Sequence, residues 1–220
     1  METNNLKAIY FDGNSYILFP SFANFPKDAL TIELWVKKES KDNVLFEFVD
    51  NDLVDYKVDL RFSFQNDNLM VTLFDSTITT TMALTNNWHH IAFVYKSFSM
   101  EDPIQIYIDG TSVPFDKTID DFSSFKFSGK GDIYVGRNEN DNKFIGYVRN
   151  LRIWDSPRTD LEIRQKMSIT LMDFDAYLVG LWYFSSMNEI ESKLGVRLPQ
   201  SFANQERDLV EAIPHAGELL

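Results

Sequence analysis

The sequence predicts an all-β fold, namely an antiparallel jelly-roll sandwich with one short helix and a C-terminal extension. Short runs of alternating apolar and polar residues, rich in β-branched and aromatic side chains, are separated by turn residues along most of the chain. Aromatic residues make up 15% of the chain, with 19 phenylalanines, and flat rings pack well on a pleated sheet. Together these patterns indicate roughly a dozen strands in two packed sheets.

The first half of the chain holds a series of short expected strands. In the run 29–38, Ile32 and Leu34 alternate with Glu33 and Trp35, so one face of the strand is apolar. The strands of this half are predicted over residues 6–11, 16–19, 29–38, 44–49, 56–64, 69–74 and 77–84.

The second half continues the strand pattern and adds one helix. Asp109-Gly110 supplies the two positive-φ positions of a tight hairpin turn. Thr159 and Glu162 fit a capping box that begins a helix ending near residue 168. The strands of this half are predicted over residues 88–96, 103–115, 132–137, 144–154 and 176–184.

The patterning changes after the last predicted strand. Residues 1–184 form the expected jelly roll, and residues 185–220 form an extension with short helical segments, because Pro199 and Pro214 interrupt a helical pattern there. This boundary predicts one domain followed by a tail.

Charge and composition exclude several classes of partner and chemistry. The formal net charge of −12 opposes binding to nucleic-acid phosphates and to anionic membranes. The chain has no cysteine, so disulfides, thiolate metal sites and a cysteine nucleophile are excluded. Neither a membrane-spanning run nor a signal peptide is present in the sequence. We therefore expect no nucleic-acid partner, no membrane insertion, and a location that is cytoplasmic or reached by a non-classical release route.

Several segments, taken in order, resemble one known superfamily. They are AIYFDGNSYILFP, ALTIELWVKK, NNWHHIAFVY, IQIYIDGTSV, FIGYVRNLRIWDSPRTDLEI and LVGLWYF. This order resembles the laminin G-like, concanavalin A-like lectin/glucanase superfamily, most of all bacterial LamG-type jelly rolls, and it is similar in pattern to the clostridial neurotoxin receptor-binding sandwich. The resemblance covers about residues 6–184. It implies two antiparallel sheets, a ligand on the concave face or at the loop rim, and in some members a structural calcium ion.

A short part of the extension resembles a second family. Residues 188–202, NEIESKLGVRLPQSF, are similar to the opening of SUKH-type immunity proteins, in which a helix leads into a Leu-Gly-x-x-Leu-Pro turn. The alternative is a docking helix that covers a sheet edge or joins a partner.

The adjacent histidines and the carboxylates give little support for catalysis. On a strand, His89 and His90 point to opposite faces and cannot share one metal ion. Glucanases of the superfamily place their carboxylates as Glu-x-Asp-x-x-Glu on a strand, and the predicted sandwich, residues 1–184, contains no such pattern. Glu47 and Asp50 lie three residues apart and so face opposite sides. We therefore expect no enzymatic activity.

Two oxygen-rich segments suggest a structural calcium ion. Asp12, Gly13 and Asn14 form a turn in the segment that matches the first hairpin of the superfamily, and Asp155 follows the long strand 144–154. The two segments meet if the first and the late strands adjoin. The alternative is that Asp-Gly-Asn is only a tight turn and that Asp155 caps the following helix.

Exposed aromatic rings, amides and charged groups are the side chains that contact sugars. We expect the four tryptophans to pack mostly in the core, because they lie within predicted strands. The candidate ligand-binding residues are Tyr56, Arg61, Phe74, Asp75, Arg137, Asn138, Asn140 and Asn142.

The sequence therefore favours a non-catalytic carbohydrate- or glycoconjugate-binding module, lectin-like in type, as the recognition part of a toxin-like assembly. The first alternative is a protein-interaction or structural module that self-associates or assembles with a partner through residues 185–220. The second is a glycoside hydrolase.

Overall fold

A computed structural model describes most of the predicted sandwich. The described residues are 8–40, 43–51, 60–74, 76–97, 102–118, 126–137, 142–171 and 175–183. The predicted extension, residues 185–220, lies outside these ranges together with its resemblance to immunity proteins.

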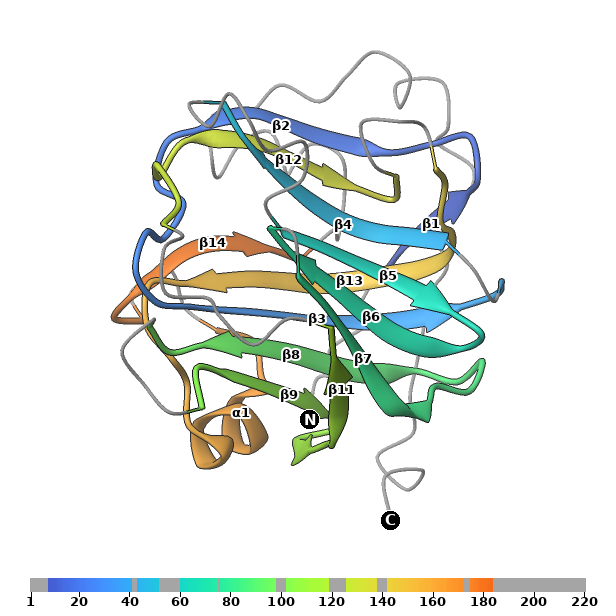
Figure 1. Ribbon diagram of the computed structural model, residues 1–220. Coiled ribbons are helices and arrows are strands. Elements are labelled where there is room, and N and C mark those ends of the chain that lie inside the picture. The colour runs from blue at the N-terminus through green and yellow to red at the C-terminus, as the bar shows by residue number, and fades with distance from the viewer. Residues whose placement is uncertain are drawn as a thin grey trace, which may run out of the picture.

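The described residues form two antiparallel sheets that pack face to face, with β5, β6 and β7 crossing over β13, β3 and β8 in Figure 1. The first sheet runs in the order β1 (Ile9–Asp12), β13 (Ile145–Trp154), β3 (Leu30–Lys38), β8 (His89–Tyr95), β9 (Ile104–Ile108) and β10 (Thr111–Ser112), with β14 (Leu178–Trp182) also paired to β13. The second sheet runs in the order β11 (Phe115–Lys117), β7 (Ser76–Ala83), β6 (Asn68–Leu73), β5 (Leu60–Gln65), β4 (Asn43–Asp50), β12 (Gly131–Val135) and β2 (Ile17–Phe22). The predicted all-β sandwich is confirmed.

The core lies between the two sheets and is built from the apolar half of each alternating strand. Phe62 of the second sheet meets Phe93 of the first sheet with ring centroids 5.7 Å apart. Phe19 packs on Trp182 at 4.7 Å across the same interface. Each fully buried aromatic side chain contributes about 1.5–3 kcal/mol through removal of its surface from water. This layer fixes the register of the strands, because a shift by one residue would expose it.

Two local predictions are confirmed by the backbone. Asp109 and Gly110 adopt φ values of 52° and 73°, as a tight β9–β10 hairpin turn requires. The helix α1 (Asp160–Lys166) begins at Thr159, whose side chain accepts a hydrogen bond from the Glu162 backbone N–H while the Glu162 carboxylate reaches back to the Thr159 backbone. The helix therefore starts where the sequence places it.

The outer faces of the two sheets differ. The helix α1 covers part of the first sheet, where Ile163 packs with Val94 and Tyr107. Within the described ranges, no helix is long and apolar enough to cross a bilayer.

Candidate functional site

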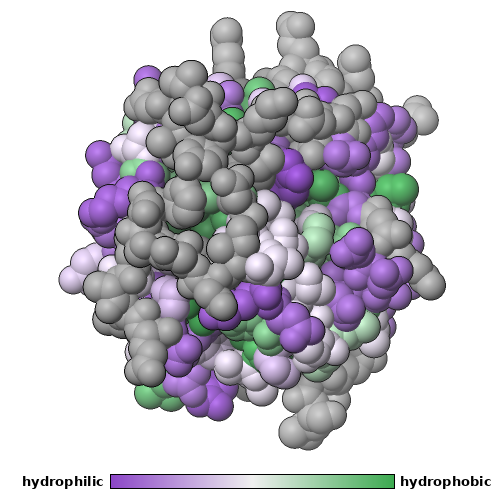
Figure 2. All heavy atoms as spheres, in the orientation of Figure 1, coloured by the Kyte–Doolittle hydropathy of each residue, from purple (hydrophilic) through white to green (hydrophobic). Residues whose placement is uncertain are grey.

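The outer face of the second sheet carries a row of polar side chains. The strand register places Tyr134 beside Glu47, Glu47 beside Arg61, and Arg61 beside Thr72, on β12, β4, β5 and β6. Their sequence neighbours, such as Phe62, point into the core. Figure 2 shows hydrophilic and pale residues over much of the visible surface in this orientation. Strand alternation therefore presents one polar surface outward.

An ion pair stands at the centre of this row. Arg61 donates from Nε to Glu47 Oε1 at 2.8 Å, and its Nη2 lies 2.7 Å from the same oxygen. The Glu47 side chain is fully buried, whereas the Arg61 side chain keeps 20% of its surface exposed. The guanidinium therefore neutralises a buried carboxylate and still presents its outer edge to solvent.

A hollow of about 460 Å³ lies beside this ion pair and brings two predicted site residues together. Arg61 and Asn142, separated by 81 positions in the sequence, both contribute to its wall. The other polar residues of the wall include Asn43, Ser63, Gln65 and Asn66. Amides, a hydroxyl and a guanidinium supply the donors and acceptors that match sugar hydroxyl groups.

The β5–β6 turn at the rim of the hollow is held by a buried lysine. Asn66 and Asp67 adopt φ values of 49° and 69°, which closes the two-residue turn. Lys38 Nζ, on a side chain only 2% exposed, lies 2.6 Å from Asp67 Oδ1 and 3.2 Å from Asn86 Oδ1. The end of β3 thus anchors the turn, which positions the Gln65 and Asn66 side chains at the hollow.

Two further ligand candidates have described positions. Arg137 stacks over the Tyr16 ring at 3.3 Å and pairs through its backbone with Lys143, which lines the hollow. Arg137 therefore lies next to the hollow. Phe74 is 4% exposed and stacks on Phe127 at 5.0 Å, so the expectation that it contacts a ligand is wrong. Among the remaining candidates, four lie outside the described residues: Tyr56, Asp75, Asn138 and Asn140.

The expected shared cation site is corrected by the strand register. The first and late strands do adjoin, but β1 pairs with the beginning of β13, where Asp12 faces Ile145. Asp155 follows the other end of β13, about 30 Å away at 3.3 Å per residue. Asp12, Gly13 and Asn14 therefore do not share a site with Asp155. Among the described residues, no group of three or more His, Asp or Glu side chains is placed to hold a metal ion.

The Asp12 turn satisfies its own carboxylate. Oδ1 of Asp12 accepts hydrogen bonds from the Asn14 backbone N–H at 2.7 Å and from the Ser15 backbone N–H and hydroxyl, both at 3.0 Å. Partial burial raises the pKa of Asp12, but these hydrogen bonds outweigh it, and the net effect is a lowered pKa. Calcium at this turn stays a prediction.

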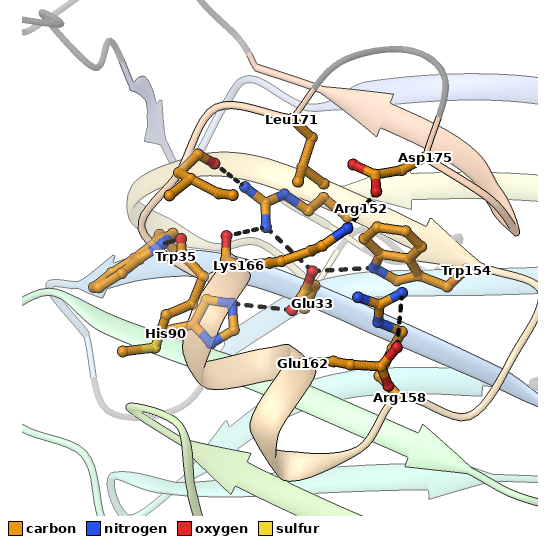
Figure 3. Close-up of polar contacts among 12 residues, drawn as sticks. Glu33, Trp35, His90, Arg152, Trp154, Arg158, Glu162, Lys166, Leu171 and Asp175 are labelled. Carbon is orange, nitrogen blue, oxygen red and sulfur yellow. Dashed lines mark hydrogen bonds and ion pairs between the residues drawn. The ribbon is translucent and has the colours of Figure 1, made fainter.

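A second polar cluster lies on the outer face of the first sheet, beneath α1 (Figure 3). Glu33 is 1% exposed, and its Oε1 accepts hydrogen bonds from Arg152 Nη1 at 3.2 Å and Trp154 Nε1 at 3.0 Å. His90 Nε2 lies 3.4 Å from Glu33 Oε2. Burial raises the pKa of Glu33, but the hydrogen bond with His90 and the positive charge of Arg152 outweigh it and lower this pKa to about 2.

The same cluster attaches the end of α1 to the sheet. Arg152 donates from Nη1 to the Lys166 carbonyl at 2.9 Å and from Nη2 to the Ile169 carbonyl at 2.7 Å. Trp35 Nε1 donates to the Met167 carbonyl at 2.8 Å. Side chains from the sheet therefore bind carbonyls at and just beyond the helix end, where intrahelical donors run out. The Glu33 cluster is best explained as a structural clamp.

The two adjacent histidines have separate partners. His90 belongs to the Glu33 cluster, whereas His89 Nδ1 lies 2.8 Å from Asp109 Oδ2 and its Nε2 lies 2.8 Å from Thr85 Oγ1. They share no ligand position, as strand alternation predicts.

Three tryptophans are buried, as expected, but in two different layers. Trp182 lies in the core between the sheets, whereas Trp35 and Trp154 lie under α1. Trp88 is partly exposed, and with Trp35 it sandwiches the Arg149 guanidinium at 4.8 Å from each ring. The period-two pattern of residues 29–38 places Glu33 and Trp35 on the same face of the strand, but it does not show that a helix covers that face.

Comparisons with solved structures support the fold. A candidate carbohydrate-binding protein from Bacteroides ovatus matches with a TM-score of 0.58 and 20% identity over 80% of this chain, which spans 51% of that protein. The heptameric SAP-like pentraxin of Limulus polyphemus matches with a TM-score of 0.63 and 16% identity, covering 84% of this chain and 92% of the pentraxin. Domains LG4–5 of the mouse laminin α1 chain match with a TM-score of 0.51 and 21% identity over 67% of this chain and 41% of theirs.

A comparison with protein-family models indicates the same fold as these structures. A search of curated protein sequences finds no significant match. The model described as the concanavalin A-like lectin/glucanases superfamily matches residues 11–164, which include every strand from β2 to β13. The chain therefore belongs to the concanavalin A-like lectin/glucanase superfamily.

Proposed function

We propose that this protein is a non-catalytic carbohydrate-binding module whose sugar-contacting surface is the hollow beside Arg61. The observation that carries the proposal is the convergence of Arg61 and Asn142 on one open, amide-lined hollow. The candidate carbohydrate-binding protein from Bacteroides ovatus, which has the same fold, supports the substrate class. A role within a toxin-like assembly stays a prediction.

The environment of Glu47 favours binding over hydrolysis. A glycosidase nucleophile or acid must reach the sugar, but the Glu47 carboxylate is fully buried and accepts hydrogen bonds from Arg61. Asp50 is 3% exposed, and its carboxylate accepts hydrogen bonds from the Ser128 backbone N–H and hydroxyl. The chain contains one Glu-x-Asp-x-x-Glu sequence, at residues 206–211, which lies outside both the family match and the described residues.

A glycan array tests the proposal. We expect binding to a defined group of glycans that soluble sugar abolishes, and we expect Gln65→Ala to weaken it. Gln65 is an exposed residue of the hollow, and the matched control is Gln165→Ala, an exposed glutamine on α1. An array without binding, together with self-association that is lost when residues 185–220 are deleted, would instead support the interaction module. Hydrolysis of a β-glucan that is lost in Glu47→Gln would support the hydrolase.

A further inference from the structure

A second hollow, of about 540 Å³, lies on the other sheet, between the β9–β10 hairpin and the beginning of α1. Its uncharged polar wall consists of Gln105, Tyr107, Thr111, Ser112 and Thr159. Gln105 accepts a hydrogen bond from the Tyr107 hydroxyl at 2.7 Å, which orients both side chains. Hydroxyls and an amide therefore line this hollow, as they would line a site for a hydroxylated ligand.

The charge of this hollow is opposite to that of the chain. Lys96, Arg158 and Arg164 contribute positive charge to its wall, and Asp160 is its one acidic residue. Arg164 Nη2 pairs with Asp160 Oδ2 at 2.6 Å, and both side chains are more than half exposed. The Lys96 ammonium group has no ion pair or side-chain hydrogen bond with any residue that the structure describes. The wall residues alone therefore carry a net charge of +2, in a chain of net charge −12.

Arg158 is held in place but is incompletely paired. Its guanidinium lies 4.0 Å from the Trp154 ring centroid, and its side chain is only 7% exposed. Nη1 lies 3.5 Å from Glu162 Oε1, whereas Nη2 has no hydrogen-bond partner among the described residues. Burying a guanidinium without full pairing costs free energy, and a negative charge nearby reduces that cost. Arg158 therefore adds positive potential to the wall from a buried position, with Glu162 as its counter-ion, whereas Lys96 is the more accessible cation of the wall.

The wall of the hollow is closely packed where the hairpin meets the helix. A Cβ atom placed on Gly110 would lie 2.6 Å from Arg164 Cγ and 3.3 Å from Met167 Sδ. Glycine is thus needed at this turn both for its φ of 73° and for this close approach. This contact fixes the hairpin against the helix, so the two elements that form opposite sides of the hollow are held together, which favours a preorganised site.

We propose that this second hollow binds the carboxylate group of an acidic saccharide, with Lys96 facing the carboxylate, the buried Arg158 guanidinium adding positive potential, and the hydroxyl-bearing wall facing the sugar ring. The site lies on the sheet opposite to the Arg61 hollow and does not depend on it. The cationic residues select for the ligand carboxylate, and the hydroxyl-bearing residues contact the sugar ring. Separate experiments can therefore test the two contributions.

Titration calorimetry with glucuronate and with glucose isolates the carboxylate, because the two sugars differ only at that group. We expect the full chain to bind glucuronate with an affinity that falls as sodium chloride is added. We expect glucose to bind at least roughly tenfold more weakly, because it lacks one charge-assisted contact. Absence of glucuronate binding, or equal affinity for the two sugars, would overturn the proposal.

Variants assign the binding to the second hollow. We expect Lys96→Gln to weaken glucuronate binding roughly tenfold and Lys96→Arg to retain most of it. Lys27→Gln is the matched control, because Lys27 is an exposed lysine that lines neither hollow. Equal effects of Lys96→Gln and Lys27→Gln would contradict the site. Loss of glucuronate binding in Gln65→Ala with no loss in Lys96→Gln would place the acidic sugar in the Arg61 hollow and overturn the proposal.

Discussion

Arg152 and Glu33, separated by 119 positions in the sequence, form a hydrogen-bonded ion pair in which both side chains are about 99% buried. The pair lies between the outer face of the first sheet and α1, and the same guanidinium also binds the carbonyls of Lys166, at the helix end, and of Ile169, just beyond it (Figure 3). Arg152 and Glu33 face each other on the paired strands β13 and β3, and the clamp adds a connection from these strands to the segment at the end of α1. The position of α1, and with it one wall of the second hollow, depends on this clamp.

Removing the arginine should destabilise the protein strongly. Arg152→Met leaves the buried Glu33 carboxylate without its arginine partner and removes a donor from the Lys166 and Ile169 carbonyls, so we expect a loss of about 3–5 kcal/mol in the free energy of unfolding. Urea denaturation measures this loss. The matched control is Arg164→Met, whose exposed pair with Asp160 is worth at most about 1 kcal/mol. Equal losses in the two variants would show that Arg152 does not clamp the helix.

The lowered pKa of Glu33 predicts a pH dependence of stability. Because the folded pKa of about 2 lies below the ordinary value of 4.5, the native state favours the ionised form. This contribution is complete above about pH 4.5 and is lost as the pH falls toward 2; its full size is on the order of 3 kcal/mol. Glu33→Gln should flatten the decline of stability over this window. Urea denaturation between pH 2 and 5 measures the slope, and parallel curves for wild type and variant would refute the assignment.

The anchor of the β5–β6 turn links stability to the Arg61 hollow. Lys38→Met removes the buried ammonium group that holds Asp67 and Asn86, and we expect a loss of about 1–3 kcal/mol. Because the turn carries Gln65, sugar binding should weaken as well. Lys126→Met removes an exposed pair with Asp28 and should change stability by less than about 1 kcal/mol. Unchanged stability in Lys38→Met would argue against the anchor.

The calcium prediction now depends on the Asp12–Asn14 turn alone. If the turn holds Ca²⁺, added Ca²⁺ raises Tm, a chelator reverses the rise, and Asp12→Asn abolishes it. Differential scanning calorimetry with and without chelator measures this directly. A Tm that the chelator leaves unchanged would dismiss calcium at this turn.

The local features of the fold were predictable from the sequence, whereas long-range packing was not. The alternation of Ile32 and Leu34, the Asp109-Gly110 turn and the Thr159 capping box each depend on neighbours within a few residues. The burial of Glu33 depends on a helix that begins more than 120 positions later, so the alternation of the strand could not show it.

The candidate site was predictable only in part, for the same reason. Arg61 and Asn142 were identified by residue type, but their convergence on one hollow follows from strand order, which spacing does not reveal. The error over Asp12 and Asp155 has the same origin. Adjacent antiparallel strands were expected correctly, yet the register decides which ends meet.

The most direct test of the proposed function is the affinity of the strongest array glycan for Asn142→Ala compared with Asn24→Ala. Asn142 lines the Arg61 hollow, whereas Asn24 is an exposed asparagine beyond the far end of β12, near Gly129. We predict that Asn142→Ala weakens binding roughly tenfold, as the loss of a sugar hydrogen bond does, and that Asn24→Ala leaves it unchanged. Equal affinities of the two variants and the wild type would contradict a sugar site in this hollow.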